Sequence, residues 1–260
     1  MTSLPAIFVS HGGPAMAVQD SPARDFLQTL AGQHPAPQGI LMISAHWETP
    51  GPAVGATEQL ETIHDYYGFP EEFYRFRYPA HGDPVLARRA ASLITAAGLG
   101  AVASSPRGLD HGAWLPLMLA YPDAAIPVTQ LSLCSGAGPE GHFQLGAALR
   151  PLRDEGVLIL CSGALTHNLR EIDREAPPGA AAGWAEEFSE WMTRRVTAGG
   201  TGDLIRYREL APNAARNHPS EEHILPLFVA LGAASPGAAG RHLHHSINYR
   251  VLAMDAYAWD

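Results

Sequence analysis

The chain has 260 residues, of which 46% are hydrophobic and 17% are charged, and its formal net charge is −9 at pH 7. This length and composition are typical of a globular protein that can bury a full core, as one large α/β domain or as two smaller domains. The negative balance argues against nucleic acid or an anionic membrane as a partner, because both need clustered basic side chains and the 17 basic residues form no dense run.

Neither a secretory signal nor a membrane span is visible in the sequence. The first five residues lack the basic region of a signal peptide. The longest apolar stretch, 224–234, is about half the length that a bilayer requires. Cys134 and Cys161 lie in apolar, strand-like segments and are interpreted as buried free thiols, with a disulfide or a metal ligand as alternatives. These features predict a soluble, cytoplasmic protein and leave its oligomeric state open.

Short apolar runs bounded by turn residues predict the strands. The four clearest runs are 6–10, 39–45, 127–133 and 157–162. Near-continuous apolar runs suit strands that helices cover on both faces. A weaker strand lies near 99–104, and the segment 242–258 could supply one or two edge strands.

Helical patterns alternate with these strands. The predicted helices are 20–31, 83–97, 141–154 and 183–198. The second is the clearest, because Asp83 is a good N-cap, Pro84 suits the first helical position and Gly98 ends the pattern. The alternation predicts an α/β fold in a single domain, residues 1–260, with a central mostly parallel or mixed sheet covered by helices on both faces.

Five of the 13 histidines lie where a predicted strand ends or a helix begins. His11 directly follows the first strand, His46 directly follows the second, and His167 comes after the strand at 157–162 and a Ser-Gly turn. Side chains at the carboxyl ends of neighbouring strands converge on the crevice where such sheets bind ligands. Since imidazole binds zinc, iron, copper and nickel, these histidines predict a metal-dependent site.

A third ligand is expected from the C-terminal part of the chain, where three residues compete for the position. His223 opens an apolar stretch, and Glu222 and His218 are its rivals. Ser220 could cap a helix whose first turn presents His223, although Pro226 comes early and could kink that helix. His223 is the preferred ligand.

Other histidines suggest different roles near the metal. His167 could be a fourth ligand, a structural residue or a general acid/base, because a non-ligating histidine exchanges protons near neutral pH. His111, flanked by Asp110, is interpreted as a loop histidine held by a carboxylate. His64 lies in an aromatic loop that could line a substrate pocket, and the cluster at 242–245 could bind a metal adventitiously.

Six motifs carry a family resemblance and occur in order between residues 10 and 227. They are Ser10-His-Gly-Gly-Pro14, Ser44-Ala-His-Trp47, Thr62-Ile-His-Asp65 with Gly68-Phe-Pro70, Leu109-Asp-His-Gly112, Ser162-Gly163 with Thr166-His-Asn-Leu169, and Pro219-Ser-Glu-Glu-His223 with Leu225-Pro-Leu227. Together they resemble the class III extradiol dioxygenases, the protocatechuate 4,5-dioxygenase catalytic-subunit superfamily. The nearest branch is that of the 4,5-DOPA dioxygenase extradiol-like proteins.

The resemblance implies a role for each of five histidines. His11, His46 and His223 would hold one divalent metal ion, His167 would be the catalytic acid/base, and His111 would lie beside the substrate or the oxygen. The wider superfamily uses two histidines and a glutamate for Fe(II), and here His223 stands in place of that glutamate. Catalytic zinc also uses three histidines, so Fe(II) is expected for activity and Zn(II) is possible in the purified protein.

The implied reaction is the opening of a catechol ring next to its hydroxyls by O2, with DOPA or another small catechol as substrate. Two other functions remain open: a zinc-dependent hydrolase with a metal-bound water as nucleophile, and a non-catalytic protein that binds a metal or small ligand. The carboxylate of an amino-acid catechol would need a cation, for which Arg75, Arg77 and Arg107 are candidates.

Overall fold

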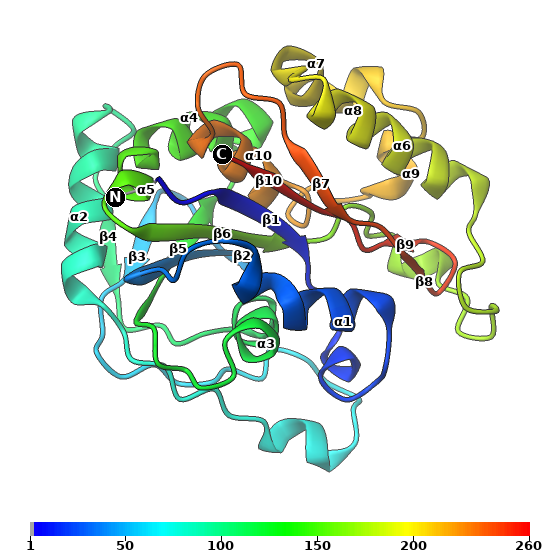
Figure 1. The fold of residues 1–260 in the computed structure, drawn as a ribbon, viewed down its shortest axis with the longest axis horizontal. Coiled ribbons are helices and arrows are strands. Elements are labelled where there is room, and N and C mark those ends of the chain that lie inside the picture. The colour runs from blue at the N-terminus through cyan, green and yellow to red at the C-terminus, as the bar shows by residue number, and fades with distance from the viewer. Residues whose placement is uncertain (1–2) are drawn as a thin grey trace.

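The computed structural model describes residues 3–260 and contains one eight-stranded mixed sheet between layers of helices (Figure 1). The strands are β1 Ala6–Ser10, β2 Gly39–Thr49, β3 Ala53–Gly55, β4 Ala103–Ser105, β5 Val128–Cys134, β6 Val157–Gly163, β7 Arg241–His244, β8 Ile247–Asn248, β9 Leu252–Ala253 and β10 Ala256–Trp259. The sheet order is β4-β3-β5-β2-β6-β1-β10-β7, and β8 pairs with β9 separately. This arrangement confirms the α/β fold predicted from the sequence.

The centre of the sheet is parallel, whereas its margins are mixed. Strands β5, β2, β6 and β1 run parallel to one another. On one side β10 and β7 add antiparallel pairs, and on the other β3 is antiparallel to β5 and parallel to β4. Because the four central strands point the same way, their carboxyl ends meet at one edge of the sheet.

Helices cover both faces of this sheet. Their bounds are α1 Pro22–Thr29, α2 Pro84–Ala96, α3 His111–Ala120, α4 Gly138–Leu149, α5 Pro151–Asp154, α6 Gly183–Thr197, α7 Thr201–Ile205, α8 Tyr207–Leu210, α9 Ala214–Asn217 and α10 Leu225–Ala233. Short 3-10 helices lie at Pro14–Ala17, Leu30–Gln33, Glu71–Arg75 and Leu169–Glu171.

Side chains of the central strands alternate between two hydrophobic cores. In β1, Ala6 and Phe8 pack in the core that contains residues of α2, α4, α6 and α10. Ile7 and Val9 pack in the other core, with residues of α1 and α3. A strand with both faces buried needs apolar residues at successive positions, which explains the near-continuous apolar runs of the sequence.

The four predicted helices exist with adjusted ends. Asp83 caps α2 as predicted, since its side chain accepts hydrogen bonds from the backbone N–H groups of Val85 and Leu86. Ser21 caps α1 through the backbone N–H of Arg24. The helix predicted over 141–154 is divided into α4 and α5, because Pro151 begins a new helical segment.

Several features of the fold differ from the prediction. The segment 242–258 supplies the edge strand β7, but β10 lies inside the sheet between β1 and β7. The short strand β3 was not predicted, and neither was α3, whose buried residues show no amphipathic pattern. A helix that is apolar on all sides carries no periodic signal in its sequence.

Two smaller predictions concern the cysteines and the membrane. Cys134 and Cys161 are both free thiols, with Cys161 buried and Cys134 half-buried. Along the described chain, no helix combines the length and the apolar character needed to cross a bilayer.

Candidate metal centre and catalytic site

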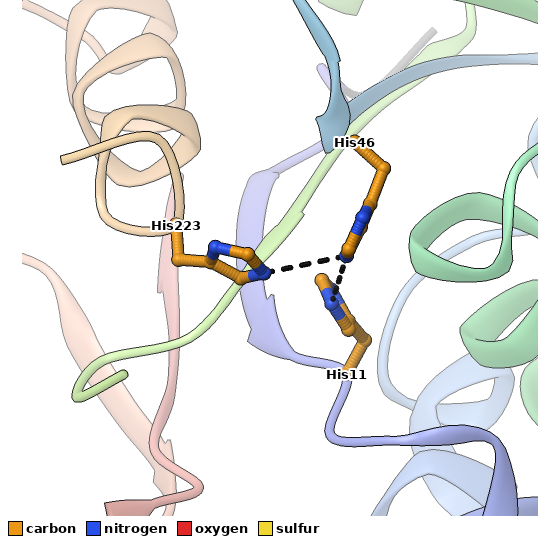
Figure 2. Close-up of side chains that lie close together, drawn as sticks. All are labelled: His11, His46 and His223. Atoms are coloured by element: carbon orange, nitrogen blue, oxygen red, sulfur yellow. Dashed lines mark hydrogen bonds between the residues drawn. The ribbon is translucent and has the colours of Figure 1, made fainter. Parts of the chain in front are cut away.

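Three histidines that are far apart in the sequence meet at the carboxyl edge of the sheet (Figure 2). Nε2 of His46 lies 3.1 Å from Nε2 of His11 and 3.3 Å from Nε2 of His223. His11 directly follows β1, His46 lies in β2, and His223 lies in the turn before α10. The structure therefore brings together the three residues that the sequence proposed as metal ligands.

An irregularity in β2 places His46 at this edge. The sequence predicted that the strand ends before His46, but β2 continues to Thr49. Its pairing with β6 reaches Ser44, while its pairing with β5 shifts register between Ile43 and Glu48. Such irregularities re-aim side chains next to active sites.

A close backbone contact places His223. The backbone N–H of Ala164 donates to the carbonyl of His223 over 2.9 Å. A Cβ atom at Gly163 would lie 2.0 Å from that carbonyl oxygen, so only glycine fits there. The predicted cap at Ser220 is wrong, because α10 begins at Leu225, and Pro226 occupies its first turn without disturbing the helix.

The outer nitrogen of each of the three rings lies close to an oxygen. Nδ1 of His11 lies 2.9 Å from Oγ of Ser162. Nδ1 of His46 lies 3.2 Å from Oδ2 of Asp65, and Nδ1 of His223 lies 2.9 Å from Oε1 of Glu222. An ionised carboxylate only accepts hydrogen bonds, so His223 donates from Nδ1 to Glu222.

This hydrogen bond leaves Nε2 of His223 unprotonated and facing Nε2 of His46. Two ring nitrogens 3.3 Å apart can share either a proton, as a hydrogen bond, or a metal cation. Nitrogen ligands about 2.0–2.1 Å from a tetrahedral ion are separated by roughly 3.4 Å, close to the distances found here. The residues therefore fit a single divalent metal ion held by three imidazoles, with carboxylates orienting two of the rings.

The two rivals of His223 have other partners. Glu222 accepts the Nδ1 hydrogen bond of His223 and so orients that ring. His218 is buried, and its Nε2 bonds the carbonyl of Leu165 over 2.8 Å. The ligand atoms of His11, His46 and His223 lie within 4.8 Å of one another, whereas Glu222 forms such a group with His167 and His223.

Burial keeps the three imidazoles neutral. It lowers the pKa of His11 and His223 well below the ordinary value, and the neighbouring histidines add to the effect. Burial, followed by repulsion from His111, lowers the pKa of His46 to about 4. Because metal ligation requires neutral imidazole, the site is ready to bind metal at neutral pH without releasing a proton.

His167 lies against one of these rings. Its imidazole stacks on that of His223 with the centroids 3.4 Å apart and the planes 12° apart. A ring nitrogen binds a metal in the plane of its own ring, so two nearly parallel stacked rings do not point at one ion. Burial lowers the pKa of His167 to about 4. This geometry favours a proton acceptor over a fourth ligand.

His111 differs from its prediction as a loop histidine, because it is the first residue of α3, which Asp110 caps. The carboxylate that holds it is Asp65: Oδ1 accepts from both Nδ1 and the backbone N–H of His111, each over 2.9 Å. Its ring lies 4.1 Å from that of His46. A Cβ atom at Gly112 would lie 2.4 Å from Oγ of Ser44, so glycine lets α3 approach the histidines this closely.

Asp65 contacts two of the histidines, although the sequence assigned it no role. Its Oδ2 lies 3.2 Å from Nδ1 of His46, and its Oδ1 accepts the hydrogen bond of His111, so a single carboxylate faces both rings. Burial opposes its ionisation, yet the bonds from His111 and the charge of His46 lower its pKa to about 2. The only sequence feature that pointed to Asp65 was its position inside the Thr62–Asp65 motif.

An aromatic wall borders the site beside His111. The Tyr66 ring lies 5.6 Å from that of His111 and 6.4 Å from that of Trp114. His64 belongs to the same cluster, and its Nε2 lies 3.1 Å from the carbonyl of Phe76. The loop therefore contributes aromatic rings next to the histidines, as the sequence suggested.

Of the three candidate arginines, Arg107 lies next to the site. Its guanidinium donates to the carbonyl of His46 over 3.1 Å and lies 5.6 Å from the Trp47 ring. Arg75 pairs with Glu71 on the surface, and Arg77 donates to loop carbonyls.

Comparison with known proteins shows the family of this chain. The family model for the catalytic LigB subunit of aromatic ring-opening dioxygenase matches residues 1–257. The chain belongs to the LigB family. LigB-family relatives named 4,5-DOPA dioxygenase extradiol include one from Beta vulgaris, 42% identical over 96% of this chain and 94% of its own length. Another, from Escherichia coli, is 38% identical over 89% of this chain and 86% of its own.

A solved LigB-type structure shares the fold. It is an uncharacterized protein from Escherichia coli K12 that aligns with a TM-score of 0.81 and 32% identity, over 99% of this chain and 100% of its own. LigB membership and the names of the relatives make the protein an extradiol ring-cleavage dioxygenase, as the sequence predicted.

Replacing Asp65 with asparagine is expected to lower activity of this LigB-family enzyme by roughly 10–100-fold, the usual cost of losing a partner that orients a metal ligand. The amide keeps the size of the side chain but removes the charge that holds two rings. Metal content and kcat, measured on the same preparations, check the expectation. The exposed Glu72, changed to glutamine, is the matched control, and an Asp65→Asn enzyme as active as that control would contradict the role.

The metal-free protein should become less stable as pH falls from 6.5 toward 4. Burial lowers the pKa of His218 from 6.5 to about 4. The unfolded chain therefore takes up a proton in a pH range where the folded chain does not, and the free energy of unfolding rises with pH across that range. The shift in the pKa of His218 changes the free energy of unfolding by roughly 3 kcal/mol across this range.

Urea unfolding of the metal-free protein between pH 4 and pH 7 measures this slope. In a His218→Asn variant the slope should be shallower, because one of the protons involved is gone. An unfolding free energy that does not change over this pH range would contradict the expectation.

Proposed function

We propose that this protein is an Fe(II)-dependent extradiol dioxygenase that opens the ring of DOPA or a related small catechol with O2. The observation that carries the proposal is the convergence of Nε2 of His11, His46 and His223, with an oxygen close to the opposite nitrogen of each ring. The relatives named 4,5-DOPA dioxygenase extradiol support the substrate class.

The three histidines would hold the metal and leave part of its coordination sphere to substrates. A bound Fe(II) would supply the redox link between the catechol and dioxygen. Three neutral imidazoles contribute no negative charge, so a catecholate is the natural partner for the ion's double positive charge. The half-buried His46 and His167 mark the side of the cluster that solvent reaches.

His167 would move the protons of the reaction. With its pKa near 4, it is unprotonated at neutral pH and can accept a catechol proton. Its protonated form is then a comparatively strong acid that can return the proton later. Stacking on His223 fixes the ring beside the metal ligands throughout.

His111 would position the catechol. Its Nδ1 hydrogen bond to Asp65 leaves Nε2 as an acceptor for a substrate hydroxyl. The nearby rings of Tyr66 and Trp114 offer apolar faces for the catechol ring. Arg107, whose guanidinium lies beside His46 and 3.5 Å from Oδ2 of Asp110, would be the arginine that attracts a substrate carboxylate.

Anaerobic loading with Fe(II), followed by air and DOPA, tests the proposal. A yellow ring-cleavage product is expected, and a panel of small catechols then ranks the substrates. Activity only with zinc and an ester would instead indicate the hydrolase that the three-histidine set also permits. Metal binding without turnover of either substrate would indicate a binding protein, and both outcomes would contradict the proposal.

Other sequence expectations stay predictions. They are one catalytic domain over residues 1–260, a cytoplasmic location, and no nucleic-acid or membrane partner.

A further inference from the structure

A second group of metal-binding side chains lies between the edge strand β7 and its neighbour β10. Nε2 of His242 and Nδ1 of His245 lie 2.8 Å and 3.0 Å from the same oxygen, Oδ1 of Asp255. His242 lies in β7, His245 directly follows that strand, and Asp255 directly precedes β10. None of these residues belongs to the three-histidine site.

Asp255 carries a buried charge that needs a positive partner. Its side chain is fully buried, and its other oxygen accepts from Oγ of Ser189 in α6 over 3.1 Å. Within residues 3–260 its ion-pair partners are these two histidines, without any arginine or lysine. Buried charges in proteins are paired or coordinate metals, so this carboxylate needs either a protonated histidine or a metal cation.

The two histidines of this group are accessible from solvent. The side chains of His242 and His245 are 27% and 43% exposed, so an ion can reach them from solvent and complete its coordination with water.

The distances fit a metal after a small adjustment. Imidazole nitrogens and carboxylate oxygens lie about 2.0–2.2 Å from zinc, so adjacent ligand atoms around a tetrahedral ion are roughly 3.4 Å apart. The contacts of 2.8 Å and 3.0 Å must therefore widen by about 0.5 Å, which the exposed rings of His242 and His245 can allow by rotating.

We propose that His242, His245 and Asp255 form a second binding site for a divalent transition metal of the zinc class. The bound ion neutralises the charge of Asp255. It also links β7 to the start of β10. Because Ser189 of α6 donates a hydrogen bond to Asp255, the ion stabilises the packing of α6 on this edge of the sheet. Two histidines and one carboxylate leave a position open to solvent, as in zinc sites that keep a water ligand.

Zinc binding to the purified full chain tests the site. Equilibrium dialysis against micromolar Zn²⁺ should give about two ions per chain for the wild type and about one for a His242→Gln/His245→Gln double variant. His244→Gln is the matched control, because His244 lies between the two ligands but bonds Oγ of Ser246 and stacks on Phe26. It should bind as much zinc as the wild type.

Measurements on a His46→Ala protein distinguish zinc binding at this second site from zinc binding at the three-histidine site. In a His46→Ala protein, about one zinc ion should remain, and adding His242→Gln/His245→Gln should remove it. Zinc should raise the melting temperature of the His46→Ala protein, and this rise should disappear in the triple variant. Ring cleavage by the iron-loaded double variant should equal that of the wild type.

Equal zinc content in the wild type and the double variant would overturn the proposal, as would a zinc-dependent rise in melting temperature that survives in the triple variant. These readouts do not involve ring cleavage. A failure of the dioxygenase proposal would therefore leave the result for this site unchanged.

Discussion

Replacing His46 with alanine should abolish metal binding and ring cleavage together. Nε2 of His46 is the atom that the other two converging nitrogens approach, at 3.1 Å from His11 and 3.3 Å from His223. Losing a direct ligand should reduce metal affinity by more than the roughly 10–100-fold that loss of an outer partner costs. Metal analysis after Fe(II) loading and the initial rate with DOPA measure the two effects.

Loss of metal through misfolding must be distinguished from loss of metal through the missing His46 ligand. The exposed His81, changed to alanine, is the matched control and should keep both metal and activity. Circular dichroism of the metal-free proteins should show the same fold for His46→Ala and wild type. A His46→Ala enzyme that binds one iron at its three-histidine site and turns over normally would refute the ligand set.

The positions of the ligands could be predicted because a regular feature of the fold determines them. Parallel strands end at one edge, so a histidine directly after the first apolar run, such as His11, had to lie in the crevice. For His46 the prediction rested on the strand ending at Ala45, yet β2 runs on to Thr49 with a register shift. A short local pattern does not show where pairing with a neighbouring strand becomes irregular.

The partners of the histidines depend on contacts that sequence patterns do not encode. Asp65 reaches His111, 46 residues away, and Ser162 reaches His11, 151 residues away. The helix α3 that begins at His111 escaped prediction because it is buried on all sides. Local patterns therefore identified the ligand candidates. The contacts of the residues next to these ligands could be recognised only in the structure.

Replacing His167 with alanine should leave the metal in place and lower turnover by about 10²–10⁴-fold, the usual contribution of a general acid/base. The ring is not among the three whose Nε2 atoms converge, so metal content should stay close to the wild-type value. Its pKa of about 4 means that the wild-type ring is unprotonated at neutral pH, which is the form that can act as a base. Measurements of metal content and of kcat with DOPA test whether turnover falls while the metal is retained.

A second variant distinguishes proton transfer from support of the neighbouring ring. Phenylalanine at position 167 can still stack on His223, as the native imidazole does at 3.4 Å, but it can neither accept nor donate a proton. If His167 acts as the acid/base, the phenylalanine and alanine variants should be similarly slow, and added imidazole should restore part of the activity of the alanine variant. Full activity with phenylalanine would mean that the ring serves only to hold His223, and the proton would then need another acceptor.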